Sequence, residues 1–339
     1  MANRFFRFKP ILLVLLLAVV SGCSPDTGKT GLKGINIFNK DENLLIDYIP
    51  EGKVFINELS KEEYSHAALI CDTGLTVLLS SDYYIGSDRT VYVGAGQTRI
   101  ENIEGIYLTN DYQSITNAYY HMIEYLGNDE KVMTVLLDGF SYNQFKIADK
   151  EGGIPFLSKY FKYPSLSVYK PVTNSGFAAI ITGQTPNVNG VHDRSVREMN
   201  VDSIFKYALD NNKNSLLLEG DIKILNSEIE PDLHIDMNKN DEIDDEIYES
   251  ALKAANEDYD LVFIHFHGID DRGHSFGPYS QETMEYIKTI DQYIKNLSED
   301  WEGAIIIVPD HGMDERAEGG EHGICVQSDM VVPYFIKEP

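Results

Sequence analysis

The chain has 339 residues, of which 43% are hydrophobic and 11% aromatic, and its formal net charge is −26. This hydrophobic content supports a packed core and excludes a chain that is disordered throughout, and the length suits one or two domains. The acidic balance excludes long nucleic acid as a partner, because like charges repel. A small phosphate ester is not excluded, because bound metal ions invert the local field.

The first 22 residues have the features of an export signal. Arg4, Arg7 and Lys9 form a basic start, and the apolar stretch 11–20 is too short to span a bilayer comfortably. It ends in Val-Ser-Gly-Cys, which resembles the lipobox of bacterial lipoproteins, where the cysteine is lipidated. The alternatives are an ordinary signal peptide and an uncleaved anchor.

We therefore expect residues 1–22 to be a signal peptide and 23–33 to be a lipidated cysteine with its tether. A diacylated Cys23 would hold the protein at a membrane surface without threading it through. The expected location is extracytoplasmic, as an exported bacterial lipoprotein on a cell-envelope membrane. Export permits a disulfide between Cys71 and Cys325, but their apolar surroundings favour two buried thiols.

Residues 34–126 are expected to form a small β-rich domain. Short alternating runs separated by turn-forming sequences predict antiparallel strands, at 44–49, 53–56, 67–71, 75–79 and 90–93. A helix over 114–126 is expected to join this segment to the next domain. We identify no catalytic or ligand-binding motif in the β-rich domain.

From residue 131 to 339 strands and helices alternate, which predicts a mostly parallel α/β sheet flanked by helices. Buried strands are expected to begin at Val132, Leu261 and Ala304, with further strands at 165–169, 215–218 and 331–336. Helices are expected at 154–160, 174–181, 202–210, 244–257 and 281–297.

Three of these strands end in candidate metal ligands. A lone Asp after a strand is usually a cap or turn residue. The inference of a metal site therefore depends on several candidate ligands occurring together at strand ends. Ligands bind beyond the carboxyl ends of strands in open α/β sheets, so the candidates are expected to meet at one edge. Asp270 and His274 flank Gly273 in an expected loop. The side chains suit zinc or a similar ion, and are Asp138, Asp270, His274, Asp310, His311 and His322.

Thr173 stands between a predicted strand and a helix expected to begin at Asn174. A hydroxyl at a helix start lies near free N–H groups and the positive end of the dipole, which favour an anion. On this segment alone, Thr173 is best interpreted as an N-cap. Beside a divalent ion, its hydroxyl could lose its proton and act as a nucleophile.

Together these motifs resemble the alkaline phosphatase superfamily over residues 131–339, and most closely its nucleotide pyrophosphatase/phosphodiesterase branch. The short spacing before His322 is more similar to the glycolipid-anchor ethanolamine-phosphate transferases of that superfamily. The matching features are an Asp after the first strand (Asp138), a Thr nine residues before Thr-Gly (Thr173 and Thr182-Gly183), Asp-x-x-Gly-His-x-x-Gly-Pro (270–278), Asp-His-Gly-Met (310–313) and a last His-Gly (322–323).

The resemblance implies an alkaline phosphatase-like domain that binds two divalent ions, expected to be zinc. One ion would be held by Asp270, His274 and His322. The other would be held by a second set, comprising Asp138, Asp310, His311 and the Thr173 oxygen.

The implied activity is hydrolysis of small phosphodiesters, pyrophosphates or nucleotides through a covalent intermediate on Thr173. The alternatives within the superfamily are a phosphomonoesterase and transfer of a phospho-head-group to an alcohol. An alternative of another class is a non-catalytic lipoprotein that binds an envelope polymer.

Two residues are expected to contact the substrate: Asn174 at the helix start, and Arg194. Family phosphodiesterases place an Asn twelve residues after the Thr of Thr-Gly, where this chain has Arg194. A guanidinium can hold two oxygens and adds a full charge, which would favour a dianionic monoester. The alternative is that Arg194 points to solvent or pairs with Asp193.

Two further patterns carry weaker expectations. His265 and His267 would face the same side of the sheet, in the core or behind the metal ligands rather than as ligands themselves. Asp236, Asn238 and Asn240 match the positions that open a calcium loop, but the glycine at position six is missing and an Ile stands at position twelve. A solvated turn before a helix with an acidic start is therefore the favoured interpretation.

Overall fold

The computed structural model describes residues 35–46, 54–55, 63–79, 83–85, 90–93 and 98–339. The expected signal peptide, Cys23 and the tether lie outside these ranges, as do parts of the predicted strands near 44–49 and 53–56. Contacts group Gly34–Pro339 into one compact unit. Within the described ranges, no helix has both the length and the apolar character needed to cross a membrane.

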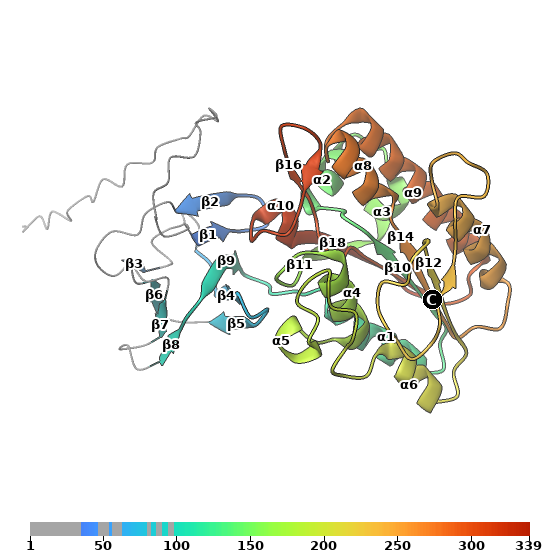
Figure 1. The fold of residues 1–339 in the computed structure, drawn as a ribbon, viewed down its shortest axis with the longest axis horizontal. Helices are drawn as coiled ribbons and strands as arrows, with labels where there is room; N and C mark the ends of the chain where they lie inside the picture. Colours follow the sequence, from blue (N-terminus) through green and yellow to red (C-terminus); the bar gives the residue numbers. More distant parts are fainter. Residues whose placement is uncertain (1–34, 47–53, 56–62, 80–82, 86–89, 94–97) are drawn as a thin grey trace, which may run out of the picture. The chain divides into compact units, whose positions relative to one another are not determined.

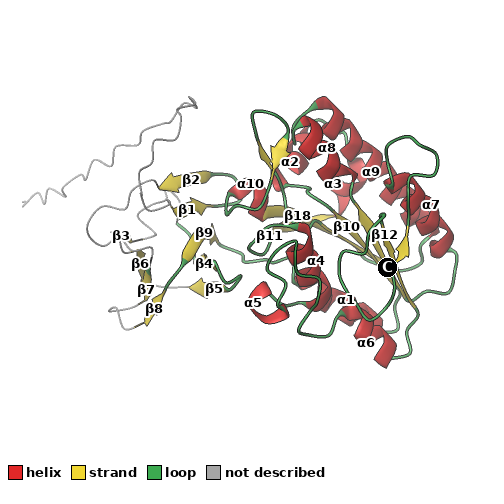
Figure 2. Cartoon of the chain, in the orientation of Figure 1, coloured by secondary structure: helices red, strands yellow, loops and turns green. Residues whose placement is uncertain are grey.

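A seven-stranded sheet forms the centre of the α/β part (Figures 1 and 2). Its order is β11-β18-β15-β10-β14-β12-β13. Five neighbouring strands from β15 to β13 are parallel, whereas β18 is antiparallel to both β15 and β11. The predicted mostly parallel α/β class is confirmed. The bounds are β10 (Val132–Leu137), β11 (Phe161–Leu166), β12 (Ser215–Glu219), β13 (Asp232–Leu233), β14 (Leu261–Phe266), β15 (Ala304–Val308) and β18 (Val331–Lys337).

Alternating side chains of the central strands pack on opposite faces of this sheet, as the pleat requires. In β10, Met133 and Val135 belong to one core cluster, and Val132 and Leu136 belong to the other. The first cluster includes side chains of α2 (Tyr142–Lys150), α3 (Pro155–Tyr160), α7 (Asp244–Ala255) and α9 (Gln281–Asp300). The second includes those of α1 (Asn117–Gly127), α4 (Thr173–Thr182) and α6 (Ile204–Asp210).

Residues before α1 form two small sheets. One has the order β2-β1-β9-β4-β5 and the other β3-β6-β7-β8. The predicted antiparallel pattern is wrong for one pair, because β1 and β9 are parallel. Cys71 in β4 and Cys325 in the α/β part are both buried, and neither forms a disulfide. The bounds are β1 (Ile35–Phe38), β2 (Asn43–Ile46), β3 (Val54–Phe55), β4 (His66–Cys71), β5 (Thr76–Leu79), β6 (Tyr83–Ile85), β7 (Val91–Val93), β8 (Thr98–Ile100) and β9 (Ile103–Thr109).

The predicted loop containing Asp270 and His274 is instead a helix, α8 (Gly268–Phe276). Gly273 suggested a turn, but its role is to let α8 pack closely against Met313, because a Cβ at this position would lie 2.5 Å from the Met313 sulfur. The predicted strand 165–169 is also displaced, because β11 ends at Leu166. The remaining short elements are α5 (Pro186–Asn189), α10 (Gln327–Met330), β16 (Asp314–Glu315) and β17 (Gly320–Glu321).

Ile264 in β14 provides a test of the core. Its side chain is fully buried in the first core cluster, and β14 itself lies between β10 and β12. We expect Ile264→Ala to lower the free energy of unfolding by about 2–5 kcal/mol, because the change removes buried methyl groups and leaves a cavity. The measurement is urea unfolding followed by circular dichroism.

The control is Leu209→Ala in α6, where the side chain is 49% exposed. That change is expected to alter the free energy of unfolding by less than about 0.5 kcal/mol. Equal effects of the two substitutions would contradict this account of the core.

Candidate active site

The candidate ligands converge at the carboxyl edge of the parallel strands. Asp138 directly follows β10, and Asp310 follows β15 after one proline. Asp270 comes from α8, which begins two residues after β14 ends. Gly139 permits the close approach: its φ is +73°, and a Cβ there would lie 2.7 Å from Asp270 Oδ1.

Asp270, His274 and His322 form the first group of possible metal ligands. The i,i+4 spacing on α8 places His274 Nε2 3.3 Å from Asp270 Oδ2. His322 Nε2 lies 3.6 Å from the other oxygen, Asp270 Oδ1.

Asp138, Asp310 and His311 form a second group. His311 Nε2 lies 3.2 Å from Asp138 Oδ1 and 3.5 Å from Asp310 Oδ2. The Thr173 hydroxyl reaches the same group, 3.4 Å from Asp138 Oδ2 and 3.5 Å from His311 Nε2. The structure therefore brings together all seven residues that sequence analysis assigned to two ions.

Backbone carbonyls orient the three histidines of these groups. Nδ1 of His274 lies 2.9 Å from the Gly320 carbonyl, Nδ1 of His311 lies 2.9 Å from that of Gly312, and Nδ1 of His322 lies 2.9 Å from that of Pro171. A carbonyl only accepts, so each Nδ1 carries the proton. A ring whose Nε2 has lost its proton would then present that lone pair toward the carboxylates, as a metal ligand must.

The donor atoms have the spacing that a shared ion requires. Bonds of about 2.0–2.1 Å at tetrahedral angles separate neighbouring ligand atoms by about 3.3–3.4 Å. The separations here run from 3.2 to 3.6 Å, which is long for a hydrogen bond. Asp270 Oδ1 and Asp310 Oδ2 are buried without a hydrogen-bond partner. These residues fit divalent ions, although their role as ligands stays a prediction.

Buried charges dominate the electrostatics of the site. Burial alone would raise the pKa of Asp138, but contacts with His265, His267 and His311 hold it well below its usual range. Burial and the neighbouring Asp138 raise the pKa of Asp310 to about 8. Such an acidic cluster needs protons or cations to compensate it.

Thr173 is the first residue of α4, not the residue before it as expected. The N-cap is Val172, which makes no capping hydrogen bond from its side chain. The first turn of α4 therefore keeps N–H donors and the positive dipole end beside the Thr173 hydroxyl, which suits a phosphoryl group. Gly176 lets this helix lie against Asp310, since a Cβ there would be 2.6 Å from the Asp310 Cβ.

Asn174 and Arg194, the two residues expected to contact the substrate, make different kinds of contact in the structure. The Asn174 amide nitrogen donates to the carbonyls of Val196 and Ile224, so the side chain holds neighbouring loops. Arg194 Nη2 contacts His322 Nε2, the nitrogen proposed to bind an ion. The sequence alternative that Arg194 pairs with Asp193 is not what the structure shows, because Asp193 accepts from Ser195 instead.

Two buried carboxylates that sequence analysis missed hold the site loops. Asp244 accepts from the N–H groups of His267 and Gly268 at the start of α8, and from the Tyr286 hydroxyl. Asp329 accepts from the N–H groups that follow His322. No local motif marks either residue, because their partners are distant in sequence.

Glu219, His265 and His267 also surround Asp138. His265 Nε2 and His267 Nδ1 lie 3.4 and 3.6 Å from Asp138 Oδ2. Glu219 ends β12 and lies 3.6 Å from His265 Nδ1. An acid at a strand end was the signal that identified Asp138, and it could have identified Glu219.

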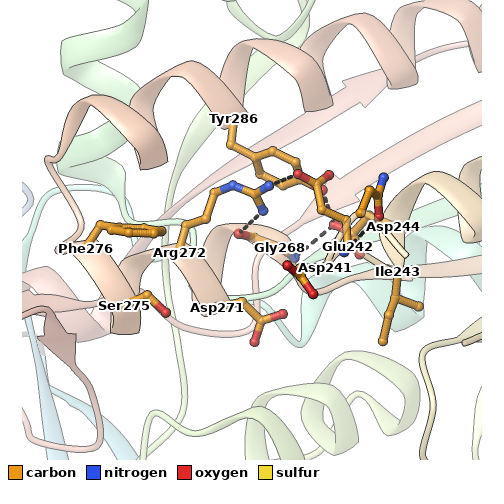
Figure 3. A pocket seen from close by; sticks show the side chains of 11 residues that line it. Asp241, Glu242, Ile243, Asp244, Gly268, Asp271, Arg272, Ser275, Phe276 and Tyr286 are labelled. Atoms are coloured by element: carbon orange, nitrogen blue, oxygen red, sulfur yellow. Dashed lines mark hydrogen bonds and ion pairs between the residues drawn. The ribbon is translucent and has the colours of Figure 1, made fainter. Parts of the chain in front are cut away.

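A cavity of about 330 Å³ lies beside α8, between that helix and the segment 240–244 (Figure 3). Arg272 crosses it, 3.6 Å from the centre of the Tyr286 ring, and pairs with Glu242. In the neighbouring loop, the Asp236 carboxylate accepts hydrogen bonds from the backbone N–H groups of Lys239, Asn240 and Asp241. The Asp236 carboxylate therefore bonds to the backbone of its own turn, and the structure gives no support to a calcium site at Asp236, Asn238 and Asn240.

A family model matches part of the C-terminal half of the chain. Residues 212–329, about a third of the chain, match the sequence model of the family "Type I phosphodiesterase / nucleotide pyrophosphatase". This segment contains the Asp270, Asp310 and His322 motifs but not Asp138 or Thr173.

Curated relatives are similar over a shorter stretch. GPI ethanolamine phosphate transferase 1 of Emericella nidulans is 37% identical over 91 residues, which is 23% of this chain and 10% of that protein. The Mus musculus transferase of the same name is 31% identical over 94 residues, 25% of this chain and 10% of that protein. The matches thus span only about a tenth of these relatives.

Similar solved structures include phosphonoacetate hydrolase from Sinorhizobium meliloti, with 18% identity and a TM-score of 0.43 over 56% of this chain and 58% of that one. Murine ectonucleotide pyrophosphatase/phosphodiesterase 5 gives 17% identity and a TM-score of 0.42 over 54% and 57%. The match over 212–329 supports a relationship of this chain to the type I phosphodiesterase/nucleotide pyrophosphatase family.

Proposed function

We propose that this protein is a metal-dependent phosphoric ester hydrolase of the phosphodiesterase/nucleotide pyrophosphatase type, with Thr173 as its nucleophile. One observation carries the proposal: the Thr173 hydroxyl stands at the start of α4, within 3.5 Å of both Asp138 and His311. A hydroxyl in a ligand cluster and at a helix N-terminus is suited to attack phosphorus, because both features favour an anion.

Asp270, His274 and His322 would hold one ion, and Asp138, Asp310, His311 and Thr173 would hold the other. Bound divalent ions, most suitably zinc for these Asp and His donors, would lower the pKa of the Thr173 hydroxyl and stabilise charge on phosphoryl oxygens. The protein itself positions the Thr173 hydroxyl and presents the N–H groups of α4 to the phosphoryl group.

In the proposed reaction, Thr173 Oγ forms a bond to phosphorus while the bond from phosphorus to the leaving oxygen breaks. The Thr173 proton passes to solvent, and the leaving oxygen takes a proton from water. In the second step a water oxygen attacks phosphorus, the bond to Thr173 Oγ breaks, and Thr173 regains a proton. The products are an alcohol and a phosphate or phosphomonoester.

Transfer to an alcohol is the second candidate, and the names of the curated relatives favour it. Those proteins are called GPI ethanolamine phosphate transferases. The same phosphothreonine would then be attacked by an alcohol oxygen in place of water. Product analysis with and without added alcohols separates hydrolysis from transfer, because only transfer gives a new phosphodiester.

We further propose that the protein acts outside the cytoplasm, held to a membrane by a lipidated Cys23. The support is the lipobox-like sequence after the apolar stretch 11–20. The rival of another class is a non-catalytic lipoprotein that binds an envelope polymer. Mature protein lacking bound metal and phosphatase activity would favour this rival.

The nucleophile can be tested with Thr173→Ala. We expect a loss of activity on bis-aryl and mono-aryl phosphates of roughly 10³-fold or more, because no other group can form the intermediate. Acid quenching during turnover should trap one phosphoryl group on the Thr173 peptide of the wild type, detected by mass spectrometry.

Thr173→Ser is the matched control, since it keeps the hydroxyl and should keep the trapped phosphoryl group. Thr182→Ser makes the same change on the far end of α4 and should leave turnover near that of the wild type. Activity that survives both Thr173→Ala and chelation of metal would contradict the mechanism.

Arg194 provides the test of substrate class. Its guanidinium adds a positive charge beside His322, which should favour dianionic monoesters. We expect Arg194→Asn to lower kcat/KM for mono-aryl phosphates by about tenfold or more relative to bis-aryl phosphates, because a charge-assisted hydrogen bond contributes about 1.5–3 kcal/mol.

The control is Arg99→Asn, which removes the same charge from an exposed position paired with Glu101 in the β-rich segment. Its ratio of monoester to diester activity should equal that of the wild type. An unchanged ratio in Arg194→Asn would show that Arg194 does not select the substrate.

A further inference from the structure

The segment from His322 to Met330 leads from a proposed ligand to the last strand, β18, and it packs against the β-rich segment. Cys325 is 3% exposed and belongs to the same core cluster as Phe38 of β1 and Tyr107 of β9. Gly105 of β9 lies directly against it, because a Cβ built on Gly105 would overlap the Cys325 sulfur. The backbone that follows His322 is therefore in close contact with β9.

Asp329 holds one ligand segment of each ion group. The residue is 0% exposed, and its Oδ2 accepts from the two N–H groups that follow His322, at 3.0 and 3.1 Å. Its backbone carbonyl accepts from the Gly312 N–H, at 2.8 Å. Gly312 follows His311, and its own carbonyl accepts from the His311 ring. One residue thus fixes the backbone beside a ligand of the first group and beside a ligand of the second.

Gln327 anchors α10, the short helix that carries Asp329. Its side chain is buried, and Nε2 donates to the Lys40 carbonyl between β1 and β2, at 2.8 Å. Its Oε1 accepts from the Asn143 amide of α2, at 2.7 Å, and its backbone N–H donates to Asn43 Oδ1 of β2. A helix of four residues is too short to be stable alone, so contacts with the β-rich segment and with α2 set its position.

The chemistry of the Gln327 contact suits positioning better than simple packing. Burying an amide without hydrogen bonds is costly, whereas an apolar side chain such as leucine would fill the space without that requirement. Apolar burial has no preferred direction, but a buried polar network whose bonds are all made specifies one arrangement. Gln327 bonds through both its nitrogen and its oxygen, so it fixes the orientation of α10 as well as its place.

We propose that the β-rich segment positions the two proposed ion sites. Its contacts are Gln327 and Cys325, and Asp329 is the residue that orients the segments of His311 and His322. The inference rests on the proposed function, because these histidines are proposed ligands. It deepens that function by giving the β-rich segment a role: residues outside the α/β part hold ligands of both groups in place.

The first test is the zinc affinity of Gln327→Leu, measured on the full chain by competition with a chromophoric chelator. Leucine has a similar size but cannot bond to Lys40 or Asn143. We expect an affinity about tenfold below that of the wild type, the lower end of the range for groups that orient metal ligands from behind. Gln292→Leu makes the same change at an exposed position of α9, where the amide donates to Asn296, and should keep the wild-type affinity.

A second test acts on the same contact from the β-rich side. Gly105→Ala places a methyl group where the Cys325 sulfur lies, so we expect it to displace the segment after His322 and to lower the zinc affinity. Adding Cys325→Ala removes the sulfur and leaves a Cβ 3.4 Å from the new methyl group, close to an ordinary van der Waals contact. The double variant should therefore regain the zinc affinity that Gly105→Ala loses, and Cys325→Ala alone should keep it.

Urea unfolding of every variant separates positioning from stability. If the contact only stabilises the fold, Gln327→Leu and Gly105→Ala will unfold more easily but bind zinc as tightly as the wild type, and the proposal is overturned. An equal loss of affinity in Gln292→Leu would also overturn it. If Gln327→Leu does not fold, the double variant decides: recovery of zinc affinity supports the proposal, and no recovery contradicts it.

The result can be told apart from a failure of the proposed function. Wild-type protein that binds no zinc would overturn the positioning role together with the metal-dependent function. Wild-type protein that binds zinc but yields no phosphothreonine on acid quenching would overturn the proposed mechanism alone, since the variants would still report on the zinc affinity.

Discussion

The site depends on carboxylates that are buried where water cannot solvate them. Asp138 and Asp310 follow neighbouring parallel strands, and their side chains are at most a few per cent exposed. Because charge in a low-dielectric interior must be compensated, the surrounding histidines respond to these carboxylates. One oxygen each of Asp270 and Asp310 has no hydrogen-bond partner. The distances from histidine nitrogens to carboxylate oxygens are 3.4 and 3.6 Å for His265 and His322, which suits a shared cation better than a hydrogen bond.

Backbone groups then fix the direction of each side chain. The Gly320, Gly312 and Pro171 carbonyls accept from three histidines, so their Nε2 atoms face inward. Glycines allow the segments to approach: Gly139 lies against Asp270, and Gly176 of α4 lies against Asp310. With both contacts in place, the Thr173 hydroxyl lies beside the carboxylates at the first turn of α4, where the proposed nucleophile and the N–H donors would meet an anionic ester together.

Sequence analysis identified most of this edge because its signals are local. Apolar runs that precede Asp138, Asp270 and Asp310 indicated buried strands, and their alternation with helices predicted a mostly parallel sheet. Several interpretations of local patterns were wrong. Gly273 indicated a loop but lies in α8 because Met313 leaves no room for a side chain. The β-rich segment was expected to be antiparallel, but β1 and β9, which the sequence patterns did not single out, are parallel. Pairing between strands so distant in sequence is not encoded in either strand alone.

By itself the sequence determined the fold class, the candidate ligands and the position of Thr173 at a helix start, since periodicity and strand-end residues are short-range properties. Only the tertiary structure decided how these residues combine. It turned the Asn174 amide toward backbone carbonyls and Arg194 toward His322, and it placed Glu219, His265 and His267 around Asp138. These contacts join residues far apart in the chain, and their geometry depends on how strands and loops pack, which no local pattern records.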